Sequence, residues 1–268
     1  MADAPSPENS AFRLVEPTLP PKSPPRFRFD HLAAHDHFSH AVFTRIGGVS
    51  APPFESLNVG LRTQDSGSAV RTNLERIRKT LRARRLAFLD QVHGNTVLPL
   101  HEGDLEKMES PPAADGLVTN VPGVGLLVKQ ADCQAVILYD PKRRVIANVH
   151  CGWRGNVANI LGAAVRCMRE TFGCRPADIL GGIGPSLGPC CGEFIGYERL
   201  FPRSFQDFMV RRNTFDLWSL SIHQLVSAGL RKEHIAVSGL CTRCRTDLFF
   251  SYRAEGQTGR FATVVLLR

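Results

Sequence analysis

One cysteine and two histidines lie where predicted strands begin or end. Cys133 follows a polar elbow between two apolar runs, His150 closes a third apolar run, and His93 stands directly before Gly94. Catalytic zinc sites take three protein ligands from His, Cys and carboxylate side chains and leave a fourth position open. An ion bound in this way makes a nucleophile from water at neutral pH. We therefore take His93, Cys133 and His150 as candidate metal ligands and candidate catalytic residues.

The same residue types also allow chemistry without a metal. Cys133 as a thiolate nucleophile and His150 as its base would form a Cys–His pair. A buried cysteine packed beside a core histidine is the structural alternative. The long, unequal separations of the three residues match no zinc-finger spacing, so spacing alone leaves all three interpretations open.

The elements around these residues are predicted from β-branched, apolar runs of strand length. Strands are expected over residues 124–130, 134–139 and 145–149. The second and third are joined by Asp140-Pro141-Lys142-Arg143, a composition typical of a tight turn. The uneven order of hairpin-like strands and helices favours a mixed α/β sandwich over a doubly wound parallel sheet.

The turn predicts which residues face each other. If Tyr139 pairs with Arg144, Cys133 lies directly opposite His150. Directly opposite residues share a sheet face, with Cβ atoms about 4.5–5.5 Å apart. A thiol and an imidazole at that separation can share a metal, whereas a slip of one residue would put them on opposite faces.

Basic and small residues near glycines are the candidate anion binders. Arg154 lies at the N-terminus of the helix expected over 156–171, where free N–H groups favour an anion. Arg45 precedes a pair of glycines that lets the backbone approach a ligand. We predict that phosphate and substrate contact a set of four residues: Arg45, Ser50, Arg154 and Arg253.

A second group of cysteines comprises Cys190, Cys191, Cys241 and Cys244. A Cys-x-x-Cys motif with a further cysteine pair is typical of a structural zinc site. Adjacent cysteines are awkward as two ligands of one tetrahedral ion, so packing or a redox-labile disulfide is at least as readily expected. This group is therefore left out of the predicted metal ligands.

Composition restricts the class of protein. The chain has 268 residues, a formal charge of +8 and eight cysteines, with no signal sequence and no apolar run of membrane-spanning length. We expect a cytoplasmic protein with reduced thiols and no membrane partner. No nucleic-acid module accompanies the positive charge, which also suits an anionic substrate. Residues 1–26, rich in proline, are expected to form a flexible tail, and residues 27–268 a single domain.

Seven ordered motifs resemble one family, the laccase-domain (YfiH-like) proteins. The resemblance covers the chain from about Val42 onward, and Lys129 stands where the family usually has a small or hydroxyl residue. The motifs are Thr44-Arg-Ile-Gly-Gly-Val-Ser50, Ser56-Leu-Asn-Val-Gly60, Gln91-Val-His-Gly94, Ala131-Asp-Cys133, His150-Cys-Gly-Trp-Arg-Gly155, Gly184-Pro-Ser-Leu-Gly-Pro-Cys-Cys191 and Phe250-Ser-Tyr-Arg253.

The resemblance implies a mixed-sheet, four-layer α/β/β/α sandwich in which His93, Cys133 and His150 bind one Zn²⁺. It implies a purine nucleoside phosphorylase acting on adenosine and inosine with phosphate, with methylthioadenosine cleavage and adenosine deamination as further activities. The alternatives are a Cys–His amidohydrolase that edits peptidoglycan precursors and, less favoured, a copper polyphenol oxidase (laccase). We expect small-molecule partners only and a monomer.

Overall fold

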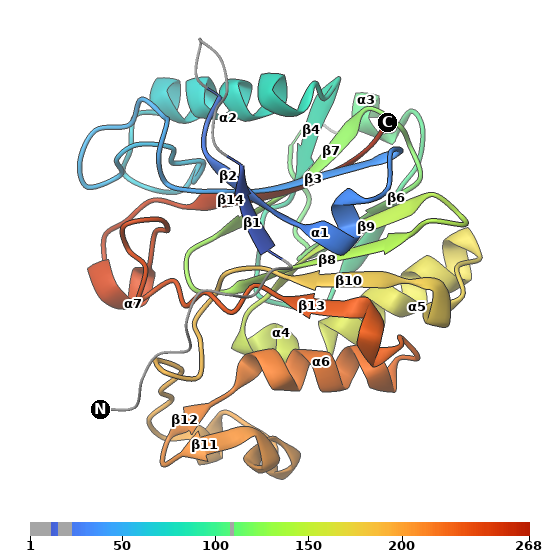
Figure 1. Cartoon of the computed structure of the whole chain (residues 1–268). Coiled ribbons are helices and arrows are strands. Elements are labelled where there is room, and N and C mark those ends of the chain that lie inside the picture. Colours follow the sequence, from blue (N-terminus) through green and yellow to red (C-terminus); the bar gives the residue numbers. More distant parts are fainter. Residues whose placement is uncertain (1–11, 16–22, 108–109) are drawn as a thin grey trace.

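Two six-stranded sheets form the centre of the computed structural model, which describes residues 12–15, 23–107 and 110–268 (Figure 1). The first sheet has the order β1 (Phe12–Val15), β2 (Arg26–Phe29), β3 (Phe38–Phe43), β14 (Phe261–Leu267), β7 (Val124–Gln130) and β4 (Arg85–Phe88). The second has the order β13 (Ile235–Val237), β10 (Leu180–Ile183), β8 (Gln134–Asp140), β9 (Val145–Cys151), β6 (Gly116–Thr119) and β5 (Val97–Leu100).

Helices and short elements surround the sheets. The helices are α1 (Asp30–Ala33), α2 (Gly67–Leu81), α3 (Asp104–Lys107), α4 (Trp153–Val157), α5 (Ile160–Phe172), α6 (Leu217–Ser227) and α7 (Tyr252–Glu255). Short 3₁₀ helices span Pro176–Asp178, Tyr197–Arg199, Arg203–Phe208 and Lys232–His234, and a small ribbon pairs β11 (Met209–Arg211) with β12 (Thr214–Phe215).

The sheets and helices form four layers. Figure 1 shows α2 on the outer face of the first sheet, and α5 and α6 on the outer face of the second. The main core lies between the sheets, where Tyr139 of the second sheet stacks on Phe38 of the first with ring centroids 4.4 Å apart. Each sheet contains parallel and antiparallel pairs. The predicted mixed-sheet α/β/β/α sandwich is therefore confirmed.

Three consecutive strands, β7, β8 and β9, carry the central part of the sequence. Every residue of β8 and β9 is buried, because helices cover one face of their sheet and the other sheet covers the opposite face. Strands buried on both faces have continuous apolar runs rather than alternation. All three strands were predicted from such runs, and β8 and β9 extend slightly beyond the predicted ends.

The predicted pairing across the β8–β9 turn is wrong. Asp140 pairs with Val145, so Tyr139 does not pair with Arg144. The Asp140 carboxylate accepts two backbone N–H groups of the turn, at 2.9 and 3.0 Å, and Arg144 closes the turn with a φ of 52°. The side chain of Asp140 thus starts the turn one residue later than predicted.

The corrected register changes the relation between Cys133 and His150. His150 lies opposite Ala135, and Cys151 lies opposite Gln134. Continued by one residue, this register places Gly152, and not His150, opposite Cys133. The observed register differs from the predicted one by an even number of residues, so Cys133 and His150 still point to the same face of the sheet. Cys133 is therefore a diagonal neighbour of His150, not its directly opposite partner.

The helix predicted over 156–171 is divided in two. α4 ends at Val157, and α5 begins at Ile160 after Asn159, which adopts a φ of 52° and accepts the backbone N–H of Gly162 at 3.1 Å. Asn tolerates the left-handed conformation and is a favoured N-cap. The division leaves α4 as a short helix that begins shortly after His150.

Part of the expected flexible tail is a strand. β1 pairs with β2, and the Phe12 ring lies 5.0 Å from the Phe27 ring and 4.5 Å from the Phe29 ring. These aromatic contacts bury Phe12 despite the proline-rich composition around it. Residues 1–11 and 16–22 of the expected tail lie outside the described residues.

Candidate metal centre and substrate cleft

His93, Cys133 and His150 meet at one point between the two sheets. One ligand atom from each residue lies within 4.8 Å of the others, and the His93 and His150 rings meet edge-on with centroids 4.8 Å apart. A Cβ atom on Gly152 would lie 2.8 Å from Cys133 Sγ, so the glycine leaves room for the thiol. This donor set of one thiol and two imidazoles fits an ion that prefers nitrogen and sulfur ligands, with a fourth position free for another ligand.

Cys133 lies at the elbow where the chain passes from β7 in the first sheet to β8 in the second. Asp132 makes this crossing with a φ of 86°. Its carboxylate accepts hydroxyl hydrogen bonds from Thr242 and Ser251, both at 2.7 Å, and the backbone N–H of Arg253 at 2.6 Å. Both oxygens of Asp132 are thus used to hold the elbow that positions Cys133.

Asp115, directly before β6, connects the two histidines. Its buried carboxylate accepts the backbone N–H groups of His93 and Gly94 at 2.9 and 2.7 Å, which holds the loop where His93 has a φ of 61°. The same carboxylate lies 2.8 Å from Nδ1 of His150 on β9. One acid therefore orients the loop that carries one ligand and the ring that supplies another.

The contact with Asp115 decides the tautomer of His150. Burial alone would raise the Asp115 pKa, but the His150 ring and the two backbone N–H groups lower it, so the carboxylate is ionised and only accepts. Nδ1 of His150 must then carry the hydrogen. Nε2 is left as the ring nitrogen that can bind a metal.

Without a metal, Cys133 and His150 form a charged pair. Burial alone would raise the Cys133 pKa, but the neighbouring His150 and His93 rings lower it to about 6. Burial alone would lower the His150 pKa, but Cys133 and Asp115 raise it to about 9. The thiolate is the form of cysteine that binds metals and attacks electrophiles, so this pair suits both kinds of chemistry.

The sequence did not single out Asp115. Nothing in its neighbouring residues indicates contact with His93 or His150. Its position becomes clear only from the pairing of β6 with β9, which places Asp115 beside the end of β9.

The three candidate ligands line a cleft of about 960 Å³, within the usual size of small-molecule sites. Aromatic and aliphatic side chains form part of its wall, including Trp153, Leu187, Phe194 and Leu217. Basic side chains form another part: Arg62, Lys129, Arg154, Arg253 and Arg260. The cleft therefore offers apolar surface for a flat ring system and positive charge for an anion.

Two of the four predicted anion binders line this cleft. Arg154 is exposed, and its guanidinium lies over the Trp153 ring, 4.5 Å from the centroid. Arg253 donates to the carbonyl oxygen of Glu193 at 2.9 Å and lies 5.7 Å from the Phe194 ring centroid. Both arginines therefore line the same cleft as the candidate ligands.

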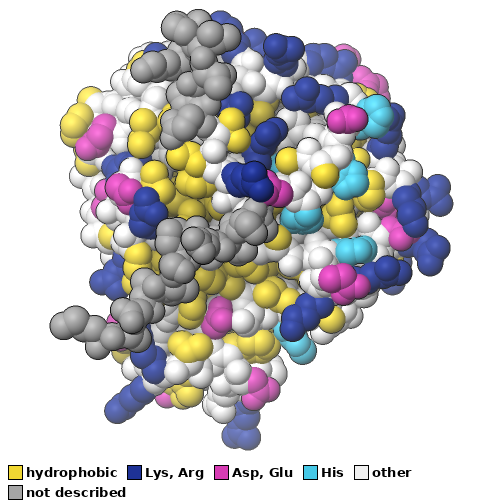
Figure 2. Space-filling view, in the orientation of Figure 1, with side chains coloured by type: hydrophobic (Ala, Val, Ile, Leu, Met, Phe, Trp, Pro, Cys, Tyr) yellow, Lys and Arg dark blue, Asp and Glu magenta, His cyan; other side chains and the backbone are white. Residues whose placement is uncertain are grey.

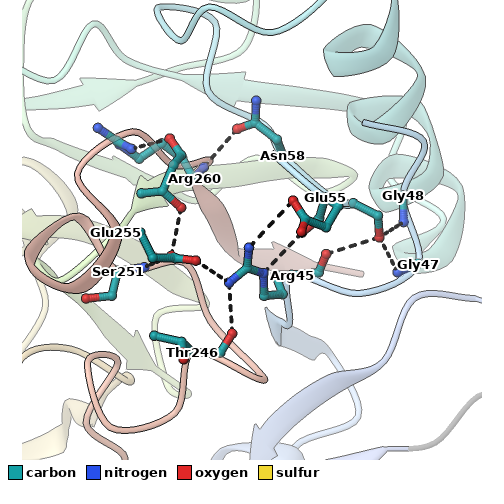
Figure 3. A network of polar contacts seen from close by, with 11 residues as sticks. Arg45, Gly47, Gly48, Glu55, Asn58, Thr246, Ser251, Glu255 and Arg260 are labelled. Carbon is teal, nitrogen blue, oxygen red and sulfur yellow. Dashed lines mark hydrogen bonds and ion pairs between the residues drawn. The ribbon is translucent and has the colours of Figure 1, made fainter. Parts of the chain in front are cut away.

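The other two predicted anion binders lie elsewhere. Arg45 points between Glu255, Thr246 and Glu55 (Figure 3), donating at 2.8 Å to the Glu255 carboxylate and the Thr246 carbonyl oxygen. Its side chain is only 11% exposed. Ser50 is buried and accepts a hydrogen bond from Asn73 at 2.9 Å. Neither residue lines the cleft, so both are left out of the proposed substrate-binding set.

Lys129 is a cleft residue that the prediction missed. Its ammonium group donates to the Leu89 carbonyl oxygen at 2.8 Å and lies 5.1 Å from the Phe88 ring centroid. Burial lowers the pKa of Lys129 to about 8, with Asp90 opposing the shift and Arg62 adding to it. The only signal in the sequence was the unusual presence of lysine in the motif before Cys133.

The positively charged side chains of the described residues are distributed over the surface rather than gathered in one patch. Figure 2 shows Lys and Arg side chains spread over the visible face with Asp and Glu between them, and no continuous basic stripe among the described residues there. None of the helices in the described ranges has the length and apolar character needed to cross a bilayer.

Comparisons with known proteins give consistent results. A family model described as "Multi-copper polyphenol oxidoreductase laccase" matches residues 39–268. The chain is 34% identical over 239 residues to "Purine nucleoside phosphorylase YlmD" of Bacillus subtilis, covering 83% of this chain and 86% of that protein. It is 34% identical over 236 residues to "Purine nucleoside phosphorylase PA4543" of Pseudomonas aeruginosa, covering 85% and 92%.

Solved structures show the same architecture. The hypothetical protein YfiH of Bacillus licheniformis superposes with a TM-score of 0.84 at 31% identity, covering 96% of this chain and 99% of that one. YlmD from Geobacillus stearothermophilus superposes with a TM-score of 0.81 at 30% identity, covering 91% and 96%.

Proposed function

The chain belongs to the family described as multi-copper polyphenol oxidoreductase laccase, and we propose that it is a zinc-dependent purine nucleoside phosphorylase. The resemblance stated from the sequence motifs is confirmed at the level of the family. The observation that carries the proposal is the placement of one His–Cys–His group within a cleft that combines basic and aromatic side chains. Relatives named as purine nucleoside phosphorylases support the choice of reaction.

Zinc is the proposed ion because of the ligands. Three protein ligands with an open position are typical of catalytic zinc, which when bound supplies a Lewis acid or an activated water. Oxidation by several coppers requires many histidines in paired motifs. The described residues contain two groups able to hold a metal, and only His93 and His150 in them are histidines.

For phosphorolysis, the protein's own residues must hold the phosphate and bind the purine. An oxygen of hydrogen phosphate forms a bond to the ribose C1′ while the bond from C1′ to the purine nitrogen breaks, and the departing purine gains the proton that the phosphate loses. Arg154, Arg253 and Lys129 are proposed to hold the phosphate, because guanidinium and ammonium groups bind phosphate oxygens strongly. Trp153 and Phe194 are proposed to pack against the purine, which has an aromatic face. We expect adenosine and inosine as substrates.

The direct test combines metal content with product analysis. Chelator-treated protein, reloaded with Zn²⁺, is expected to release hypoxanthine from inosine only when phosphate is present. Cys133→Ala is expected to lose both the ion at this site and the activity. Full turnover by a Cys133→Ala protein that lacks the ion at this site would refute the proposal. The same assay with adenosine and methylthioadenosine tests deamination and methylthioadenosine cleavage.

A Cys–His amidohydrolase is the second candidate, favoured by the Cys133 thiolate beside a protonated His150. This activity predicts loss of turnover on alkylation of Cys133, no need for phosphate, and hydrolysis of an amide in a peptidoglycan precursor. Phosphate-dependent release of the purine base decides in favour of the phosphorylase.

A further inference from the structure

Four cysteines form a second cluster outside the cleft. β10 and β13 lie side by side in the second sheet (Figure 1), and the loops that follow them carry Cys190 and Cys191, and Cys241 and Cys244, respectively. One sulfur atom from each cysteine lies within 4.8 Å of the others. Two loops far apart in the chain thus bring four thiols to one point.

The distances indicate a shared centre rather than a disulfide. The Cys244 sulfur lies 3.6 Å from the sulfurs of both Cys190 and Cys191. A tetrahedral zinc with Zn–S bonds of about 2.3 Å separates its sulfurs by about 3.8 Å. A disulfide would join one pair at about 2.05 Å and leave the others out. Core packing does not account for the group either, since Cys190 and Cys244 are exposed.

The backbone explains how adjacent cysteines reach one centre. The segment from Gly188 to Cys191 is a tight turn in which the Cys191 N–H donates to the Gly188 carbonyl oxygen at 2.9 Å. A Cβ atom on Gly188 would lie 2.8 Å from Trp218 and 3.2 Å from the Cys241 Cβ, so only glycine allows this close approach. Adjacent cysteines were considered awkward as two ligands of one tetrahedral ion, but here the sulfurs of both Cys190 and Cys191 lie 3.6 Å from the Cys244 sulfur.

The surroundings suit a negatively charged thiolate site. The backbone N–H of Gly188 donates to the Cys241 sulfur at 3.4 Å, and Arg211 donates to the Cys190 carbonyl oxygen at 2.7 Å. The hydrogen bond to one sulfur and the Arg211 guanidinium beside Cys190 favour thiolates around a divalent ion.

We propose that Cys190, Cys191, Cys241 and Cys244 bind a structural zinc ion, separate from the ion at His93, Cys133 and His150. Four cysteine ligands leave no open position, so the ion has a structural and not a catalytic role.

One of the two loops that the ion would join forms part of the cleft wall, and both loops contact Asp132. Leu187 donates its backbone N–H to the Asp132 carbonyl oxygen at 2.8 Å, and Thr242 donates to the Asp132 carboxylate at 2.7 Å. Leu187 and Phe194 line the cleft. The proposed ion therefore links two segments that hold the elbow before Cys133.

Elemental analysis of protein purified under reducing conditions with ZnCl₂ present, then dialysed, tests the proposal. Cys133→Ala is expected to keep one zinc per chain, and Cys190→Ser/Cys244→Ser to lose one zinc relative to the wild type. Cys167→Ser/Cys174→Ser, which removes two thiols outside the cluster, is the matched control and is expected to keep the wild-type content. This inference does not depend on the proposed activity, and these variants separate the two sites.

Alkylation of the wild-type protein gives a second measurement that needs no variant. Cys190 and Cys244 are exposed, yet bound zinc should protect both from iodoacetamide until a chelator removes the ion. Rapid alkylation of these two cysteines in the zinc-loaded protein would overturn the proposal. So would a Cys133→Ala protein without zinc, a metal other than zinc at the cluster, or a disulfide within it.

Discussion

At the scale of single residues, Asp115 joins the parts of the candidate metal centre. It contacts the backbone of the His93 loop and Nδ1 of His150, but supplies no metal ligand of its own. Carboxylates that fix a ligating imidazole affect metal affinity through its orientation and basicity. The centre is therefore built from four residues, of which three were candidates from the sequence.

Asp115→Asn is expected to weaken zinc binding by about 10–100-fold, because the amide presents a weaker acceptor to the His150 ring and to the loop N–H groups. Competition with a chromophoric chelator measures the affinity. Asp178→Asn removes a carboxylate that is paired with Lys142 outside the cleft, and it should leave the affinity unchanged. Equal affinity of Asp115→Asn and the wild type would show that Asp115 does not position a ligand.

Lys129 gives the cleft a charge that depends on pH. Since burial lowers its pKa to about 8, the ammonium is charged below that pH and neutral above it. The KM for phosphate is expected to increase as the pH rises through this value, where free phosphate is already mostly the dianion and the loss of the ammonium charge is the main change. Lys129→Arg should remove the step, and Lys129→Met should show a high KM at every pH. A step that persists in Lys129→Met would assign the titration to another group.

At the scale of elements, two arginines that looked alike in the sequence have different roles. Arg45, which follows β3, contacts α7 through Glu255 and the loop before α7 through Thr246, and its guanidinium lies 4.4 Å from the Phe250 ring centroid. Arg154 lies on α4, where its guanidinium contacts Trp153 at the cleft wall. Both precede or adjoin glycines, so local sequence did not distinguish the two.

Arg45→Met is expected to lower the free energy of unfolding by about 1.5–3 kcal/mol. The substitution removes the hydrogen bonds of a nearly buried guanidinium and leaves the Glu255 carboxylate without its arginine partner. Urea denaturation measures this change. Arg154→Met is expected to leave stability unchanged and to raise the KM for phosphate. The reverse pattern, a stable Arg45→Met protein with poor phosphate binding, would restore Arg45 to the substrate site.

Strands could be predicted because their apolar runs depend only on burial, and the helices' apolar faces follow the same rule. The register of β8 and β9 could not, because one hydrogen-bonding side chain, that of Asp140, moved the turn. The contacts of Asp115 could not be predicted either, nor could the meeting at one point of the four cysteines that the sequence had singled out as a group. Each depends on contacts between segments far apart in the chain, which no local pattern reports.

At the scale of the whole molecule, the candidate centre lies where the chain changes sheets. Cys133 is at the crossing between β7 and β8, which are interior strands of their sheets. In the first sheet, β1 forms the edge opposite β4, the strand that leads toward His93. A substitution in β1 should therefore lower the stability of the protein without changing the activity at the cleft.

Phe12 tests this separation, because its ring is 9% exposed and packs on Phe27 and Phe29. Phe12→Ala is expected to destabilise the protein by about 3 kcal/mol, the low end for a truncated aromatic, since β1 is an edge strand. Urea denaturation should show this loss, while kcat/KM well below the unfolding temperature stays at the wild-type value. Leu14→Ala in the same strand is the control, because Leu14 is 41% exposed and its truncation should cost little. Equal effects of the two substitutions would mean that β1 does not pack on the sandwich through Phe12.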